Sequence, residues 1–301
     1  MKIRIGARGS ALSLTQTELV ARALREGAEV EVVPIRTTGD RLSRLEAAMT
    51  GKDLFTREID EALLGGRIDV GVHSLKDLPS RLPDRLTLAA VPRREDPSDV
   101  LVSRQRKTLA SLPPGARVGT SSARRRAQVL AARPDAEVLE ARGNIDTRIR
   151  RLDEERWDAI VLARAGLARL GRLDEVAEVL PFSTMLPAIG QGALAIVARE
   201  DDPAVRDRVS RLDDLVSHRE VRAERALLDL LEAGCRAPVA GLARVEGDRL
   251  RLAGAVFAPD GSRTLREEAE GPAEDPERLG REVAERLLAR GAASLIALAR
   301  G

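Results

Sequence analysis

Short apolar stretches alternate with amphipathic stretches along the chain, and several segments repeat one order of elements. An apolar strand leads into a turn rich in Gly, Ser, Thr and Arg, and a helical pattern follows. Alternation of strands and helices predicts mainly parallel sheets with functional residues at the carboxyl ends of the strands. The predicted pairs are strand 3–7 with helix 11–25, strand 117–119 with a helix through residue 132, strand 137–141 with helix 145–155, and strand 158–163 with a helix after residue 166.

The pattern changes in the last third of the chain. After a charged helix predicted at 204–215, a helix around 217–232 precedes alternating segments at 237–245, 249–258 and 263–270, and a helix at 275–290 closes the unit. Asp260 and Gly261 form a typical hairpin turn signal. Consecutive strands flanked by helices predict a small α+β domain with an antiparallel sheet.

Two proline-containing segments, 92–97 and 181–192, indicate crossings between domains, and the strand-like residues 193–198 return to the first one. A chain of 301 residues is also long for a single core. We therefore expect domain 1 at 1–94 and 193–212, domain 2 at 95–192, and domain 3 at 215–301.

Composition excludes several classes of protein. The net charge is only +2 and aromatic residues make up 1%, which argues against nucleic-acid binding. No apolar run approaches the roughly 18 residues of a membrane span, and the first residues show no signal-peptide core; with one unpaired cysteine, these features favour the cytoplasm. Two histidines and one cysteine cannot build a typical zinc site. This leaves a metal held by carboxylates alone as an open alternative, but we expect none. The absence of Tyr and the scarcity of Met favour a thermophilic source or a GC-rich genome.

Three groups of residues could carry chemistry. Asp77 follows an apolar strand, where a carboxylate can stabilise a cation or transfer a proton; the alternative is an exposed turn in which Lys76 is solvated. The single cysteine, Cys235, is either a small buried hydrophobe or a thiol kept for covalent chemistry. Arginines follow several strands and could bind a substrate rich in carboxylates, or they could be surface residues.

Hydroxyl side chains stand at the starts of the predicted helices. Ser10, Thr120 and either Ser121 or Ser122 occupy positions where an N-cap belongs. A helix N-terminus beside an arginine is also an anion site. Because this pairing recurs in separate segments, the pattern favours anion binding.

Ten motifs in one order resemble the hydroxymethylbilane synthase (porphobilinogen deaminase) family over nearly the whole chain. They are Ala7-Arg-Gly-Ser10, Gly51-Lys-Asp-Leu-Phe55, His73-Ser-Leu-Lys-Asp77, Arg94-Glu-Asp-Pro97, Gly119-Thr-Ser-Ser-Ala-Arg-Arg125, Arg142-Gly-Asn144, Ala165-Gly-Leu-Ala-Arg-Leu-Gly171, Leu186-Pro-Ala-Ile-Gly-Gln-Gly192, Ala223-Glu-Arg225 and Gly234-Cys235. Each motif alone is weak, but the ordered combination is specific.

The resemblance implies a transferase of tetrapyrrole (porphyrin and heme) biosynthesis. It implies stepwise head-to-tail condensation of four porphobilinogen molecules with loss of ammonia, followed by hydrolytic release of hydroxymethylbilane. The growing chain is held on a dipyrromethane cofactor, and the resemblance places its thioether on Cys235. It makes Asp77 the catalytic carboxylate, which contacts pyrrole nitrogens and stabilises the azafulvenium cation.

The resemblance also implies roles for further residues. A mobile lid loop is implied at Lys52 and Phe55. Cofactor contacts are implied for Ser74, Lys76, Asp77, Thr120, Ser122, Arg124, Arg125, Arg142 and Gly143. Substrate contacts are implied for Arg8, Ser10, Arg142, Arg148, Arg169 and Gln191.

The fold that the resemblance implies is α/β, with two lobes like those of type II periplasmic binding proteins and a small C-terminal α+β domain. Their sheets should be mixed and mainly parallel, and the C-terminal sheet antiparallel. A monomer is expected, with porphobilinogen as its small-molecule partner and neither nucleic acid nor membrane.

Two other functions compete with this interpretation. A two-lobed binding protein for a polycarboxylate solute would explain the repeated units and the anion sites, but it has no use for Cys235. A cysteine hydrolase needs a base near its nucleophile, and neither His73 nor His218 lies in a motif of that kind.

Overall fold

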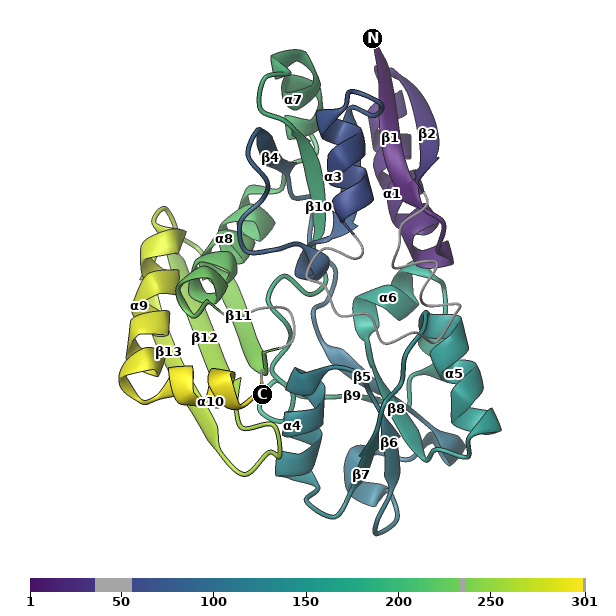
Figure 1. The fold of residues 1–301 in the computed structure, drawn as a ribbon, viewed down its shortest axis with the longest axis vertical. Coiled ribbons are helices and arrows are strands. Elements are labelled where there is room, and N and C mark those ends of the chain that lie inside the picture. The colour runs from purple at the N-terminus through teal and green to yellow at the C-terminus, as the bar shows by residue number, and fades with distance from the viewer. Residues whose placement is uncertain (36–55, 233–236, 300–301) are drawn as a thin grey trace. The chain divides into compact units, whose positions relative to one another are not determined.

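The computed structural model describes residues 1–35, 56–232 and 237–299. Contacts between residues group the chain into two compact units. Unit 1 comprises Met1–Glu95 and Ala193–His218, and unit 2 comprises Asp96–Gly192 and Arg219–Gly301. Figure 1 traces the elements of both along the chain.

Unit 1 is built on a five-stranded sheet of order β2-β1-β3-β10-β4. β1 pairs in parallel with β2 and β3, whereas β10 runs antiparallel to β3 and β4. The elements of the unit are β1 (Lys2–Arg8), α1 (Ala11–Arg25), β2 (Glu29–Ile35), α3 (Arg57–Leu64), β3 (Val70–Ser74), η1 (Leu75–Asp77), β4 (Leu86–Ala90), β10 (Leu194–Arg199) and α7 (Pro203–Ser210).

Unit 2 contains a second five-stranded sheet, of order β7-β6-β8-β5-β9. Here β6 pairs in parallel with β7 and β8, and β5 runs antiparallel to β8 and β9. Its elements are β5 (Asp99–Ser103), η2 (Arg104–Arg106), η3 (Leu109–Ser111), β6 (Arg117–Gly119), α4 (Ala123–Ala132), β7 (Glu137–Leu139), α5 (Ile145–Glu154), β8 (Ala159–Ala163), α6 (Arg164–Arg169), η4 (Leu173–Glu175) and β9 (Glu178–Val179).

The two five-stranded sheets share one topology. In both, four of the five strands run in one direction, and the remaining one, β10 or β5, is the strand that begins just after the chain has passed from one unit to the other. This strand runs against its neighbours, so each sheet is mixed, with two parallel and two antiparallel ladders. The expected return of residues 193–198 to the first sheet is confirmed by β10.

The C-terminal part of unit 2 is an antiparallel sheet of order β11-β12-β13. Leu227 and Val283 both pack over Gly254, so the helices that carry them lie on one face of this sheet; Figure 1 shows α9 running along it. The elements are α8 (Leu215–Leu230), β11 (Val239–Glu246), β12 (Arg249–Phe257), β13 (Thr264–Pro272), α9 (Pro276–Ala289) and α10 (Ala292–Leu298).

The opposite face of this sheet packs against the part of unit 2 that contains the five-stranded sheet. Leu242 and Phe257 form an apolar cluster with Ala127 of α4 and with Leu186. The C-terminal sheet is therefore sandwiched between its own helices and α4. These three sheets confirm the expected fold class, whereas the division into three domains at the predicted boundaries stays a prediction.

One expected helix is wrong. The helix predicted at 204–215 ends at Ser210, and α8 begins at Leu215. The cause is Asp214, whose carboxylate accepts a hydrogen bond from the backbone N–H of Ser217 at 2.8 Å. An Asp in this position caps a new helix, so the polar run that looked like one helix is a break between two.

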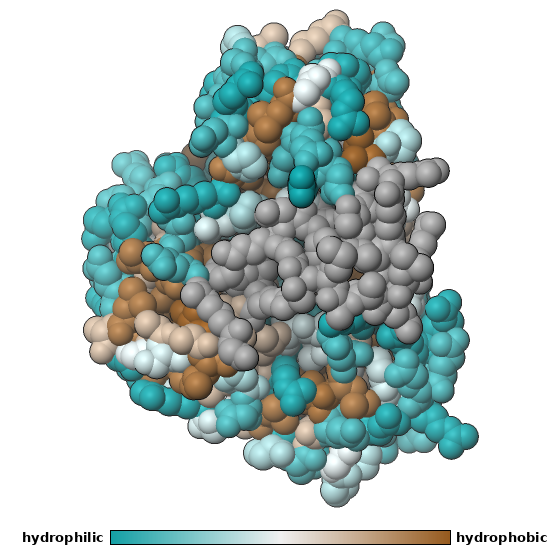
Figure 2. Space-filling view, in the orientation of Figure 1, coloured by the Kyte–Doolittle hydropathy of each residue, from teal (hydrophilic) through white to brown (hydrophobic). Residues whose placement is uncertain are grey.

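None of the helices described here is long and apolar enough to cross a membrane. Figure 2 shows a face covered mostly by hydrophilic residues, with smaller hydrophobic areas between them.

Gly261 provides a test of how the C-terminal hairpin meets α4. It lies in the turn between β12 and β13 with φ +76°, and a Cβ built there would lie 2.6 Å from the carbonyl oxygen of Ala127. Gly247 has a similar φ of +64° but no atom within 4 Å of such a Cβ. We expect Gly247→Ala to cost about 1 kcal/mol of unfolding free energy for the left-handed backbone, and Gly261→Ala to cost about 1–3 kcal/mol more for the overpacking. Urea titration of both variants measures the difference, and equal losses would contradict the packing described here.

Candidate active site

Asp77 is positioned by the strand that precedes it. β3 is buried apart from Ser74 at its end, and Leu75 directly after it is also buried. The backbone N–H of Leu75 donates to the carbonyl oxygen of Ala193 at 3.0 Å, which ties the short helix η1 to the chain entering β10. Asp77 ends η1 and is exposed. Its carboxylate therefore lies at the carboxyl end of a parallel strand, as expected.

A pocket in unit 1 brings together four of the predicted site residues. Arg8, Ser10, Ser74 and Asp77 all line it, and they come from the ends of β1 and β3 and the start of α1. The described residues that complete the lining are Leu12, Ser13, Gln16, Thr56, Val72 and His73. A cation, two hydroxyls and an exposed carboxylate on one pocket can bind a ligand that carries both an acidic group and N–H donors.

Hydrogen bonds orient the polar groups of this pocket. The side-chain amide of Gln16 donates to Ser74 Oγ at 2.9 Å, and the backbone N–H of Arg8 donates to Ser13 Oγ at 3.2 Å. Ser10 caps α1 by accepting from the backbone N–H of Ser13. Ser10 thus has the capping role that competed with anion binding in the sequence, while it also lines the pocket.

His73 is a pocket residue to which the sequence analysis gave no role of its own. It is 5% exposed, and within the described part of the chain its Nε2 has no hydrogen-bond partner. Burial, assisted by the positive charge of Arg8, lowers the pKa of His73 to about 4. The imidazole is therefore neutral near pH 7. The sequence signal for this burial was the position of His73 within an apolar strand, where the side chains are buried.

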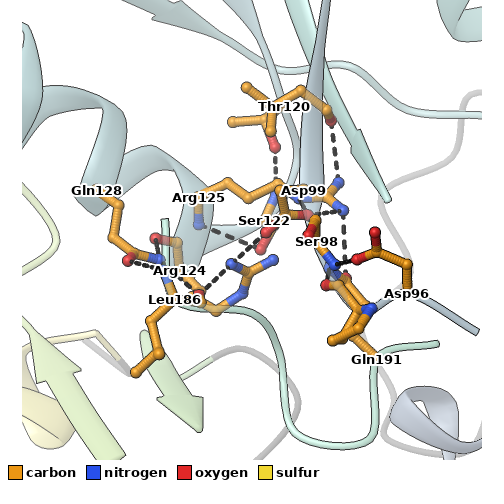
Figure 3. Close-up of polar contacts among 12 residues, drawn as sticks. Asp96, Ser98, Asp99, Thr120, Ser122, Arg124, Arg125, Gln128, Leu186 and Gln191 are labelled. Carbon is orange, nitrogen blue, oxygen red and sulfur yellow. Dashed lines mark hydrogen bonds and ion pairs between the residues drawn. The ribbon is translucent and has the colours of Figure 1, made fainter. Parts of the chain in front are cut away.

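In unit 2, Arg124 and Arg125 converge on one carboxylate, that of Asp99 (Figure 3). Asp99 is fully buried, and each guanidinium has a nitrogen 2.7 Å from one of its oxygens. Burial alone would raise the pKa of Asp99, but the charges of the two arginines outweigh it and lower the pKa to about 2. The carboxylate is ionised at any physiological pH.

Burial excludes the alternative that Arg124 and Arg125 are surface residues. Arg124 and Arg125 are 4% and 5% exposed, and Gln191 is completely buried. The amide nitrogen of Gln191 donates to Asp99 at 2.9 Å and to the carbonyl oxygen of Pro97 at 2.7 Å. Their predicted contacts with cofactor or substrate stay predictions, and the contacts present here are with one another.

The hydroxyl groups near this cluster accept hydrogen bonds from backbone N–H groups. Ser122 caps α4 by accepting from the N–H of Arg125, and Thr120 Oγ1 accepts from the N–H of Ser122 at 3.2 Å. Asn144 caps α5 in the same way through the N–H of Thr147.

The remaining predicted arginines are held by nearby polar groups. Arg142 pairs with Glu140 at 2.7 Å and keeps about half of its side chain exposed. Arg148 donates to the carbonyl oxygen of Gly143 at 2.8 Å, and Arg169 donates to that of Gly192 at 2.6 Å. The turn after β7 thus brings Arg148 to Gly143, beside Arg142.

Several predicted site residues are not part of the pocket. Lys76 is partly exposed and is not among the lining residues. Lys52, Phe55 and Cys235 lie outside the described residues. Across the ranges that the structure describes, no group of three His, Cys, Asp or Glu side chains could hold a metal ion.

Comparison with known proteins identifies two family models that cover most of the chain. Residues 3–207 match "Porphobilinogen deaminase, dipyromethane cofactor binding domain", and residues 218–289 match "Porphobilinogen deaminase, C-terminal domain".

Curated relatives match over nearly their full length. A porphobilinogen deaminase from Geobacillus kaustophilus is 49% identical over 98% of this chain and 96% of its own. The corresponding protein from Rubrobacter xylanophilus is 49% identical over 100% and 98%. That from Geobacter sulfurreducens is 47% identical over 98% and 94%.

Among solved structures, a BvgS VFT2 domain from Bordetella pertussis aligns with a TM-score of 0.43 at 15% identity, over 70% of this chain and 86% of that one. An arginine-specific periplasmic binding protein from Salmonella typhimurium aligns with a TM-score of 0.41 at 15% identity, over 72% and 93%.

His73 should make the stability of the protein depend on pH. An unfolded chain binds a proton at histidine near pH 6.5, whereas the folded protein resists it down to about pH 4. The unfolded state therefore binds more protons between these values, and the free energy of unfolding falls as the pH is lowered. This histidine should remove about 2 kcal/mol between pH 7.5 and pH 5. Chemical denaturation of the wild type and of His73→Gln at both pH values measures the effect. Parallel losses in the two proteins would show that His73 does not cause it.

Proposed function

The chain belongs to the porphobilinogen deaminase family, transferases of tetrapyrrole biosynthesis that work with a dipyrromethane cofactor, and we propose that Asp77 is its catalytic carboxylate. On this proposal, porphobilinogen is condensed stepwise and head to tail, ammonia is lost at each of four steps, and hydroxymethylbilane is finally released by hydrolysis. The observation that carries the role of Asp77 is its place in a pocket with Arg8, Ser10 and Ser74.

The charge of Asp77 suits this chemistry. Loss of ammonia from an aminomethyl pyrrole leaves positive charge on the substrate ring. An anionic group close to that ring stabilises the charge as it develops, most strongly where water is excluded. Asp77 is exposed and can therefore reach a bound pyrrole N–H. Arg8 in the same pocket supplies a cation for a substrate carboxylate.

The described residues also fit a dipyrromethane, which carries carboxylates and pyrrole N–H groups. One carboxylate, Asp99, faces the two guanidiniums of Arg124 and Arg125, so their buried cluster has a net charge of +1. Arg124 Nε has no hydrogen-bond partner within the described ranges. Within unit 2, Arg124 would hold a carboxylate of the cofactor. When bound through Cys235, the cofactor supplies a covalent primer.

Further arginines are proposed for the growing product. Each added ring brings an acetate and a propionate, and Arg142, Arg148 and Arg169 are proposed to bind these groups. The last two are oriented by backbone carbonyl oxygens of their own unit. Lys52 and Phe55 are proposed to act as a lid.

We also propose that the protein is a monomer that works in the cytoplasm. A cysteine that is alkylated by its own cofactor has to remain a free thiol until that reaction occurs. Reducing compartments keep thiols in that state.

Attachment of the cofactor to Cys235 can be tested by intact mass. Protein expressed in cells that make porphobilinogen should exceed the mass of its sequence by one dipyrromethane. Cys235→Ser should lack the addition. Because the chain has a single cysteine, a thiol-specific label is a control, which should modify only protein made without porphobilinogen. Active wild-type protein of unmodified mass would refute the covalent attachment.

The role of Asp77 can be tested by comparing it with a second exposed aspartate of the same unit. Asp77→Asn should reduce kcat by about 100-fold or more, because one preorganised charge is lost, while the melting temperature changes little. Asp84→Asn should leave both unchanged, since Asp84 is exposed and lies outside the lining of the pocket. Steady-state formation of hydroxymethylbilane provides the measurement. Normal turnover by Asp77→Asn would remove this residue from the mechanism.

A further inference from the structure

The cluster around Asp99 treats its two arginines differently. All three guanidinium nitrogens of Arg125 have acceptors: Nε donates to Asp99 at 2.9 Å, Nη1 to the carbonyl oxygen of Val161 at 3.0 Å, and Nη2 lies 2.7 Å from Asp99 and 3.5 Å from Gln191. Arg124 donates only through Nη1, to Asp99 and to the carbonyl oxygen of Leu186, each at 2.7 Å.

The remaining side of Arg124 lacks a hydrogen-bond acceptor among the described residues. Among the described residues, no hydrogen bond involves its Nε or Nη2, although Nε is buried. These two nitrogens form the edge of a guanidinium that meets a carboxylate through two parallel hydrogen bonds. A buried donor without a partner is costly, so an incoming carboxylate is favoured at this edge.

Asp99 determines which side of Arg124 is available. Its Oδ2 accepts from Nη1 of Arg124, and its Oδ1 accepts from Arg125 (Figure 3). Because Asp99 is the only carboxylate paired with either arginine in the described ranges, its removal would leave two buried cations facing each other. The orientation of Arg124 thus depends on Asp99.

Asp99 is itself fixed from a distant part of the chain. Gln191 donates to Asp99 at 2.9 Å, and the neighbouring backbone N–H of Gly190 donates to Glu224 at 2.6 Å. Glu224, on α8, is fully buried and also accepts from the N–H of Ala243 on β11 at 2.9 Å. The two hydrogen bonds of Glu224 thereby connect the segment around Gln191 to the C-terminal sheet.

We propose that Asp99, held by Gln191, is a positioning residue that orients Arg124 so that its Nε–Nη2 edge binds a carboxylate of the pyrrole ligand. The ligand chemistry rests on the proposed function. The new element is the dependence of ligand binding on a residue that does not touch the ligand.

Charge and position make opposite predictions for Asp99→Asn. This change raises the charge of the cluster from +1 to +2, so a purely electrostatic role predicts tighter binding of an anionic ligand. A positioning role predicts weaker binding, because Arg124 is no longer held by an anionic acceptor on its Nη1 side.

Asp69 offers a matched control in unit 1. It is also a buried aspartate shared by two arginines, Arg4 at 2.7 Å and Arg199 at 3.3 Å. It precedes β3, whereas Asp77 and the pocket follow that strand. Asp69→Asn therefore breaks the same kind of ion pair at a place without a proposed ligand contact.

The experiment uses full-length apoprotein made in cells that lack porphobilinogen. This apoprotein is incubated with increasing concentrations of porphobilinogen, and intact mass gives the fraction that carries the adduct. Asp99→Asn should raise the half-loading concentration by about tenfold or more, the effect of losing a charge-assisted hydrogen bond. Asp69→Asn should lower the melting temperature but leave the half-loading concentration unchanged.

Gln191→Met keeps the charge of the cluster and removes the hydrogen bonds of the amide to Asp99, to the carbonyl oxygen of Pro97 and with Arg125, so it tests the proposal if Asp99→Asn does not fold. It should also raise the half-loading concentration. If Asp99→Asn folds, an unchanged or lower half-loading concentration would overturn the proposal. If Asp99→Asn does not fold, the same result for Gln191→Met would overturn it. Failure of the wild type to load would instead refute the proposed cofactor attachment.

Discussion

The ionised carboxylate of Asp99, buried between two guanidiniums, is the constraint on which the architecture of unit 2 depends. A buried charge without partners costs several kcal/mol, so the first residue of β5 and the first turn of α4 have to meet at one point. The segment that carries Gln191 has to reach the same point, and Glu224 fastens that segment to the C-terminal sheet. One electrostatic requirement thus joins three parts of the chain that are far apart in sequence.

Unit 1 uses the same kind of contact for a different purpose. Asp69 joins Arg4 of β1 to Arg199 of β10 at the end of the sheet where β3 begins. The end where β3 stops carries Asp77 and the pocket. The ion pairs of Asp69 lie at one end of β3 and the exposed carboxylate of Asp77 lies beyond the other end. Among the contacts described for Asp77, none is with a cationic side chain.

Local sequence signals predicted much of the fold. The helix at 11–25, the three C-terminal strands and the caps at Ser10 and Ser122 follow from periodicity and capping, which depend on residues within a few positions of each other. The same signals failed at Asp214, because a polar residue between two charged helices can either continue a helix or start a new one. They also gave no sign that Arg124 would be buried, since its partner lies 25 residues away.

The sequence by itself determined the order of most elements and the family, and it singled out Asp77 and Cys235 as the predicted catalytic carboxylate and cofactor attachment point, because motifs and periodicity are properties of neighbouring residues. Only the tertiary structure decided that Arg124, Arg125 and Gln191 form a buried cluster on Asp99, that His73 stays neutral, and that α4 packs on the C-terminal sheet. The physical reason is that burial and charge pairing depend on which strands become neighbours. That order follows from packing of the whole chain.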